Sequence, residues 1–128
     1  MLMLEKSGPL FSDHQIKLTE SHQAHKTSVP GTAASMAHSL GLQNSDIRSV
    51  RDPNVQQAEL HIPQAHLARH AYHQVLIEDG PCGLKLEASV YGESPYADGV
   101  ARIVSAVNVQ KLENRLYPIM EFINNGWL

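Results

Sequence analysis

Apolar and polar residues alternate in several parts of the chain, which is the pattern of half-buried β-strands. In residues 15–19, Ile16 and Leu18 point to one side and their neighbours to the other. The two clearest strands are 70–78 (HAYHQVLIE) and 84–91 (LKLEASVY), and the Gly- and Pro-containing turn between them predicts an antiparallel hairpin. Shorter strand candidates lie at 47–51 and 57–62.

Other segments have the spacing of helices. Residues 31–40 are rich in Ala, Thr32 lies in the first turn, and Gly41 stands where a helix commonly ends. From residue 97 apolar residues recur every three or four positions, which predicts a second helix. A last helix is expected over 112–123, with Pro118 as a kink or restart.

The order of these elements indicates the fold class. The strands cluster in sequence and do not alternate regularly with helices. We therefore expect an α+β fold with a mixed or antiparallel sheet of about four strands and helices packed on one face. Residues 1–13 are interpreted as a tail or linker, 14–128 as one domain, and 20–30 as a loop.

Composition narrows the class of protein. With 128 residues, 42% of them hydrophobic, the chain is long enough for one core. A net charge of -3 without a Lys/Arg cluster argues against nucleic acid as the main partner. Cys82 is the only cysteine, so no intrachain disulfide can form. We expect no signal peptide and no membrane span, and therefore a cytoplasmic protein.

The densest chemistry lies in the polar stretch from residue 20 to the helix start at 31. A helix N-terminus offers free N–H groups, and Gly31 and Thr32 stand there. Lys26 adds positive charge, and His22 can exchange a proton near neutral pH. These residues suggest a site for a small anion handled by acid–base chemistry. The alternative is that Thr32 is only a helix cap and Lys26 is solvated.

This stretch resembles the signature of the dihydrodipicolinate reductase family, Glu-x-His-His-x-x-Lys-x-Asp-x-Pro-Ser-Gly-Thr. The matching residues are Glu20, His22, Lys26, Pro30, Gly31 and Thr32. Downstream, residues 96–101 (YADGVA) are similar to the family's Phe-Ala-x-Gly-Ala run. Together the resemblance covers residues 14–123 in the family's order.

The resemblance implies roles for these residues. His22 would be the general acid, Lys26 would assist proton delivery, and Gly31 with Thr32 would hold a substrate carboxylate. Gln23, at the second His position, is placed with the substrate-binding residues. The chain would be the substrate-binding and oligomerisation domain of an oxidoreductase of lysine and diaminopimelate synthesis, assembled as a homotetramer. Hydride would come from NADPH or NADH on a separate nucleotide-binding domain.

Several positions depart from the family pattern. Gln23 and Ser28 replace the second His and the Asp, and one residue is missing before Gly31. Ala88 and Glu93 stand where the family has a His and an Arg. These departures favour an alternative, a free-standing, non-catalytic domain that binds a small anion or only assembles.

Other constellations lack the required context. The sequence has no G-x-G-x-x-G, so we expect no binding of NADH or NADPH by this chain alone. His70 and His73 should point to opposite faces of a strand, so we expect no zinc site with His66. No serine lies in a nucleophile elbow, which excludes the common hydrolase pattern.

Overall fold

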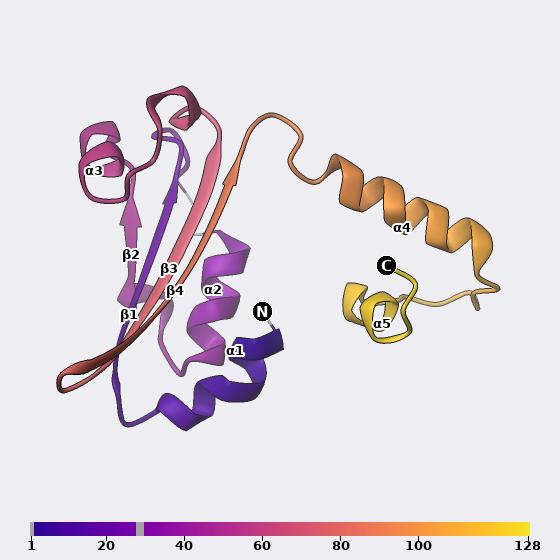
Figure 1. Ribbon diagram of the computed structural model, residues 1–128, viewed down its shortest axis with the longest axis horizontal. Coiled ribbons are helices and arrows are strands. Elements are labelled where there is room, and N and C mark those ends of the chain that lie inside the picture. Colours follow the sequence, from indigo (N-terminus) through magenta and orange to yellow (C-terminus); the bar gives the residue numbers. More distant parts are fainter. Residues whose placement is uncertain (1, 28–29) are drawn as a thin grey trace. The chain divides into compact units, whose positions relative to one another are not determined.

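The computed structural model describes residues 2–27 and 30–128, so Ser28 lies outside the described residues. The chain divides into two units, Met1–Gly92 and Glu93–Leu128, and each is treated by itself. The first unit contains a four-stranded sheet with short helices (Figure 1). The second contains two helices.

The sheet confirms the predicted α+β class. Its strands are β1 (Gln15–His22), β2 (Ile47–Val50), β3 (His70–Asp79) and β4 (Cys82–Tyr91), in the order β2-β1-β3-β4. β1 pairs in parallel with β2 and antiparallel with β3. The predicted antiparallel β3–β4 hairpin is confirmed and is the longest pair, and Gly80 allows its tight turn with a φ of 56°.

One face of the sheet is covered by the helices α1 (Leu2–Ser7) and α2 (Gly31–Ser39) (Figure 1). Alternate residues of the strands supply the sheet side of this core. The core residues are Leu4, Leu18, Ala33, Ala37, Leu40, Ile47, Val75 and Ile77. The helix predicted over 31–40 is confirmed, and its C-terminal Gly41 has a φ of 72°.

A second, smaller core lies on the opposite face. It contains Val50, Leu60, Ile62 and Tyr72, with Val55 of α3 (Pro53–Ala58) packed against it. The strand predicted over 57–62 is therefore wrong. Pro53 begins a helix that the Asp52 side chain caps by accepting from the Asn54 backbone N–H. Residues 60–62 are then a connection in which Leu60 and Ile62 are buried. Two 3-10 turns, η2 (Asn44–Asp46) and η3 (Gln64–His66), complete this unit.

Two further expectations differ from the structure. Residues 2–11 are not a tail: α1 and η1 (Gly8–Phe11) are helical, and Leu4 is buried in the main core. Residues 20–22 are not loop, because β1 continues through His22 and Glu20 pairs with both Ser49 and His73 across the sheet. Both differences arise from long-range packing that local patterns do not reveal.

The second unit consists of α4 (Ala97–Val109) and α5 (Ile119–Asn124). The helix predicted from residue 97 is confirmed. The one predicted over 112–123 is correct only from residue 119, because Pro118 is extended and caps α5. Trp127 packs edge-to-face on Phe122, with ring centroids 5.3 Å apart.

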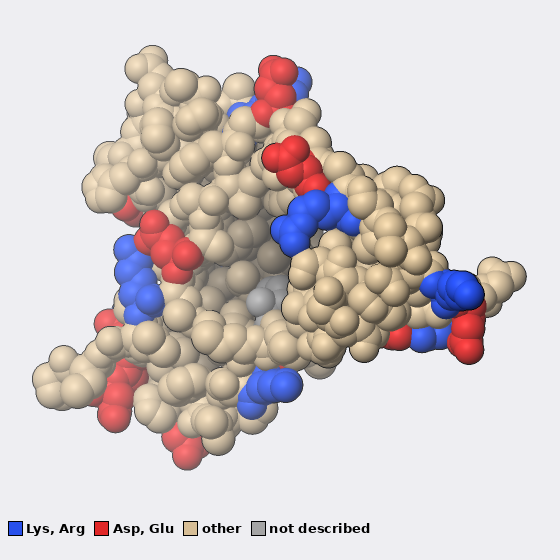
Figure 2. Space-filling view, turned by 45° about the vertical axis from the view of Figure 1, so that its right-hand side comes forward, with Lys and Arg blue, Asp and Glu red and all other residues tan. Residues whose placement is uncertain are grey.

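Within the described residues, no helix is both long and apolar enough to cross a membrane. Charged side chains of both signs are interspersed over the face shown in Figure 2, where blue and red groups lie next to each other.

Candidate functional site

Glu20, near the end of β1, is the centre of a buried polar cluster. Its side chain has 0% exposure, although it is a carboxylate in the interior of a small domain. A buried charge is tolerated only when other groups pair with it and donate hydrogen bonds. The partners of Glu20 therefore define this part of the molecule.

Arg51, directly after β2, supplies the opposite charge. Its Nη2 donates to Glu20 Oε1 at 2.6 Å and its Nη1 to Oε2 at 3.1 Å, which is a two-pronged ion pair. The Nε of the same guanidinium donates to the backbone oxygen of Lys26 at 2.9 Å. Arg51 thus joins the end of β1 to the loop that follows it.

His22 is the third member of this cluster. Its Nδ1 lies 2.8 Å from Glu20 Oε2, and because an ionised carboxylate can only accept, Nδ1 carries the proton. The backbone oxygen of His22 accepts from Gln56 Nε2 at 2.7 Å. The His22 side chain remains 13% exposed, so a carboxylate orients a histidine that still reaches the surface.

His73 of β3 lies against His22, with ring centroids 5.7 Å apart in an edge-to-face arrangement. The register places His73 opposite Glu20, on the sheet face that α2 covers. His70 lies three residues earlier and therefore points to the other face. The predicted opposite orientation of these two histidines is confirmed.

His70 is held by two partners on that other face. Its Nδ1 lies 3.1 Å from the His66 backbone oxygen, which can only accept, so Nδ1 donates. Its Nε2 then accepts from the Ser21 hydroxyl at 2.9 Å. Ser21 has 0% exposure, so this pair is a satisfied core contact and not an accessible nucleophile.

The remaining predicted residues lie in the connection from β1 to α2. Gln23 and Lys26 are half-buried and lie in the turn after His22, whereas Gly31 and Thr32 are exposed in the first turn of α2. Pro30, in an extended conformation, stands at the N-cap position of α2. Its side chain cannot accept a hydrogen bond from the first N–H groups of the helix. No contact between Gly31 or Thr32 and His22 is observed among the described residues.

The structure therefore extends the sequence-based site. The family signature includes Glu20 without a role, and the sequence pattern does not place Arg51 or His73 in the site. Their participation depends on strand pairing between segments about 30 and 50 residues apart, which no local pattern reveals. Glu93, expected near the site, belongs to the second unit.

The buried charges shift the acid–base properties of the cluster. Burial raises the pKa of Glu20, but hydrogen bonds from His22, Arg51 and Ser49 outweigh it and lower the pKa to about 2. The pKa of His73 is lowered by burial and by the neighbouring His22. Burial also lowers the pKa of His70, despite its backbone partners. Both histidines are therefore neutral at pH 7.

These shifts predict that the protein loses stability in two steps on acidification. Below about pH 6.5 the unfolded chain binds protons at His70 and His73 before the folded chain does, so stability falls. Glu20 adds a second loss between about pH 4.5 and 2. The free energy of unfolding measured with urea should be roughly 1 kcal/mol lower at pH 5.5 than at pH 7.5.

The first step has a matched control. His73→Leu should reduce the difference in the free energy of unfolding between pH 7.5 and 5.5. His38→Leu, a change at an exposed position on α2, should leave that difference as it is. An equal pH dependence in wild type and His73→Leu would contradict the assignment to His73.

Among the described residues, no group of three or more His, Cys, Asp or Glu side chains is arranged to hold a metal ion.

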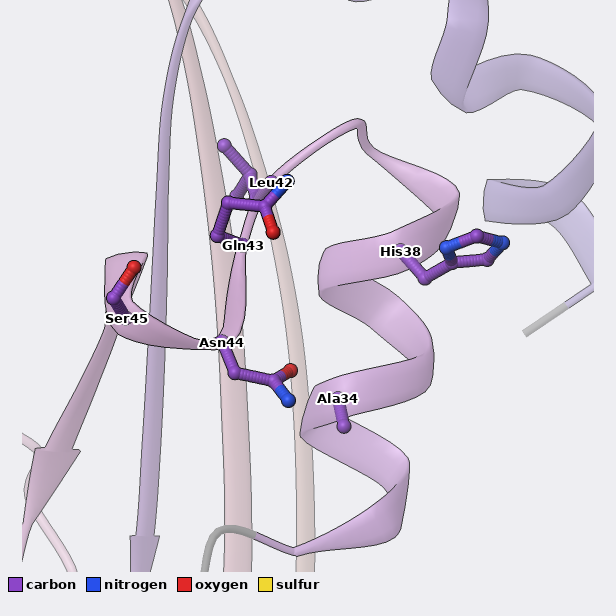
Figure 3. Close-up of a pocket in the computed structure, with 6 residues that line it drawn as sticks. All are labelled: Ala34, His38, Leu42, Gln43, Asn44 and Ser45. Atoms are coloured by element: carbon purple, nitrogen blue, oxygen red, sulfur yellow. The ribbon is translucent and has the colours of Figure 1, made fainter.

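An open pocket of about 510 Å³ lies between α2 and the loop after it (Figure 3). It is lined by Ala34, His38, Leu42, Gln43, Asn44 and Ser45. None of the predicted site residues lines it, and the His38 ring points away from the loop (Figure 3). We therefore place the candidate site at the Glu20 cluster.

Two comparisons with known proteins find similarity to reductases. No family model matches the chain. Over 98% of its length it is 29% identical to the probable 4-hydroxy-tetrahydrodipicolinate reductase 1, chloroplastic, of Oryza sativa subsp. japonica, and 28% identical to reductase 1 of Arabidopsis thaliana. A dihydrodipicolinate reductase from Paenisporosarcina sp. TG-14, solved with dipicolinate bound, superposes with a TM-score of 0.53. It is 19% identical, over 83% of this chain and 44% of that one.

These relatives confirm the resemblance stated from the sequence motif. The chain is similar to one part of a dihydrodipicolinate reductase, and it covers 39% of each of the two plant relatives. The likeness to the solved structure supports the fold of that part.

Proposed function

We propose that this chain is the substrate-binding and oligomerisation part of a dihydrodipicolinate-reductase-like oxidoreductase, of the lysine and diaminopimelate type. The observation that carries the proposal is the hydrogen bond from His22 to the buried Glu20 carboxylate. It orients a partly exposed histidine at the start of the loop that leads to Gly31 and Thr32. The similarity to the plant reductases supports the same assignment.

In this proposal the chain binds a carboxylate and supplies a proton. Gly31 and Thr32, at the start of α2, hold a carboxylate oxygen of the substrate through N–H groups and the Thr32 hydroxyl. Lys26 stabilises the negative charge from the preceding turn. His22 donates the proton, and the anionic Glu20 stabilises the charged imidazolium before transfer.

A nicotinamide cofactor would supply the hydride, and we expect it to be held outside this chain. The turn with Gly80 and Gly83 joins two strands and does not open a helix, and no G-x-G-x-x-G occurs in the sequence. NADPH or NADH would therefore be bound by a separate nucleotide-binding domain.

The anion site can be tested by NMR titration with pyridine-2,6-dicarboxylate and with sulfate. We expect amide shifts at Gly31 and Thr32, and Lys26→Ala should weaken binding about ten-fold. Lys17→Ala is the control, because Lys17 pairs with Glu78 on the opposite face of the sheet. Shifts that avoid α2, or equal binding by Lys26→Ala, would contradict the proposed site.

We also propose that the chain forms a homo-oligomer, with a tetramer as the expected state. The sheet face away from α2 carries half-buried Leu76 between Lys17 and Lys85, so any interface there would be largely polar. Light scattering at micromolar concentration should give four times the mass of one chain, and a clean monomer would contradict the prediction.

The alternative is a non-catalytic domain that binds a small anion or only assembles. Ala88 and Glu93, at positions where the family has a His and an Arg, favour it. The DNA upstream of this reading frame separates the two proposals. A segment there that encodes a strand, a G-x-G-x-x-G and a helix would support the reductase.

A further inference from the structure

One edge of the sheet is formed by β4, and this edge is long (Figure 1). Among the described residues no strand pairs with the outer side of β4, which has ten residues and no proline. Seven of these residues are exposed and none is buried, whereas the other edge strand, β2, has only four residues. Sheets commonly keep their edge strands short or irregular, because the N–H and C=O groups of a long edge can pair with another strand. The β4 edge is therefore suited to pairing.

The register of the hairpin shows which backbone groups of β4 point outward. In an antiparallel pair, alternate residues of a strand bond to the neighbouring strand, and the residues between them point to the other side. Gly92, directly after β4, donates its N–H to the backbone oxygen of Arg69, the next residue in the register, at 3.4 Å. The even-numbered residues of β4 therefore bond to β3. The odd-numbered ones, including Lys85 and Glu87, present their N–H and C=O groups at the outer edge.

The side chains of β4 are complementary to a second copy of the same strand. Lys85 and Glu87 flank Leu86 and lie on the sheet face away from α2. If two copies run antiparallel with Leu86 at a two-fold axis, Lys85 of each copy stands opposite Glu87 of the other. On the opposite face Leu84 then meets Ala88, and the two Leu86 side chains meet each other. This alignment also joins the outward backbone groups of Lys85 and Glu87, so the backbone and the side chains require the same register.

The charges in this arrangement alternate in sign. Within one chain, Lys85 Nζ already lies 2.6 Å from Glu87 Oε2. In the antiparallel pair each of these side chains would also face an opposite charge across the strands, which stabilises a sheet, whereas like charges destabilise it. Leu84, which is 44% exposed, would gain an apolar neighbour in Ala88 of the other copy. A second copy therefore satisfies the charged and the apolar side chains of this edge together.

We propose that two copies of this chain associate through the outer edges of β4, antiparallel and centred on Leu86. The two four-stranded sheets then form one continuous sheet. A symmetric pair requires one surface that is complementary to itself, and the pattern of charged and apolar residues about Leu86 has this property. The inference rests on the proposed homo-oligomer and names the surface that joins two copies. It does not depend on the proposed anion site.

A disulfide tests the alignment. In a Cys82→Ser background, Leu86→Cys places two thiols opposite each other at a non-hydrogen-bonded pair, where the Cα atoms are about 4.5 Å apart. We expect mild oxidation to give a disulfide-linked dimer. Ala88→Cys in the same background is the matched control, because residue 88 lies on the same face of the strand. Its two copies would lie about 14 Å apart, four residues along the strand, and should stay unlinked.

Charge reversal covers the case in which Leu86→Cys does not fold, because Lys85 and Glu87 are exposed. Lys85→Glu places like charges opposite each other and should weaken association, measured by sedimentation equilibrium, about ten-fold. Lys85→Glu combined with Glu87→Lys should restore it. Arg48→Glu makes the same change of charge on β2, at the other edge of the sheet, and should associate like wild type.

The outcomes separate this inference from the others. An oligomer that is unchanged in Lys85→Glu, or that links as readily through Ala88→Cys as through Leu86→Cys, would overturn the β4 pairing and leave the homo-oligomer standing. A dimer that links only through Leu86→Cys would support the pairing, although it would contradict the expected tetramer. A clean monomer would overturn both. The anion titration with Lys26→Ala is independent of all three results.

Discussion

Arg51→Met should lower the free energy of unfolding by about 3 kcal/mol, because it leaves the Glu20 carboxylate buried without its cation. The carboxylate has 0% exposure, and Arg51 provides two of its hydrogen bonds. The pKa of Glu20, about 2 in the folded protein, should rise in the variant, so the loss of stability between about pH 4.5 and 2 should become smaller. Urea unfolding at neutral pH and an acid titration of both proteins measure these effects.

The strand β2, which ends just before Arg51, offers a matched control. Arg48, three residues before Arg51, forms an ion pair with Glu59, and both side chains are about half exposed. Arg48→Met should therefore cost less than about 1 kcal/mol. Glu20→Gln combined with Arg51→Met should be more stable than Arg51→Met alone, since the unpaired charge is gone. Equal losses for Arg48→Met and Arg51→Met would contradict a buried ion pair.

This ion pair joins residues far apart in the sequence, and such contacts could not be predicted from local patterns. The hairpin, the helix at 31–40 and the helix from 97 were predictable because their apolar spacing is regular and their ends carry Gly or Pro. The polar run from Glu20 to His22 has the composition of a loop. It is a strand because Arg51 and His70, distant in sequence, satisfy its side chains.

The strand prediction over residues 57–62 was wrong for a different physical reason. Leu60 and Ile62 alternate with His61 and are both buried, as in a strand, but His61 adopts a φ of 54°, which no strand contains. The signal for a helix was Asp52 before Pro53, a capping residue followed by the residue preferred at the first helical position.

The candidate site was predictable in part. Of the residues predicted from the sequence, His22 lies in the Glu20 cluster, whereas the roles of Lys26, Gly31 and Thr32 on the connection from β1 to α2 stay a prediction. Glu20 could have been given a role from its place two residues before His22, since residues i and i+2 of a strand share a face. Arg51 and His73 required the pairing of β1 with β2 and β3.

Gly8→Ala should destabilise the first unit by roughly 1–3 kcal/mol, because an added methyl group would collide with the backbone of α2. A Cβ at position 8 would lie 2.0 Å from the carbonyl oxygen of Ser39 and 2.9 Å from its carbonyl carbon. Neither atom belongs to a flexible side chain, so η1 would have to move away from the end of α2. That movement would draw Leu4 out of the main core.

Gly31→Ala is the matched control for this prediction. A Cβ at Gly31 would meet nothing within 4 Å, so the same substitution should leave stability unchanged or raise it by up to about 1 kcal/mol. Thermal and urea unfolding of the two variants compare one chemical change at a tight and an open position. If residues 2–11 formed a loose tail, both variants would unfold like wild type. A selective loss in Gly8→Ala would instead show that these residues pack against α2, as the burial of Leu4 indicates.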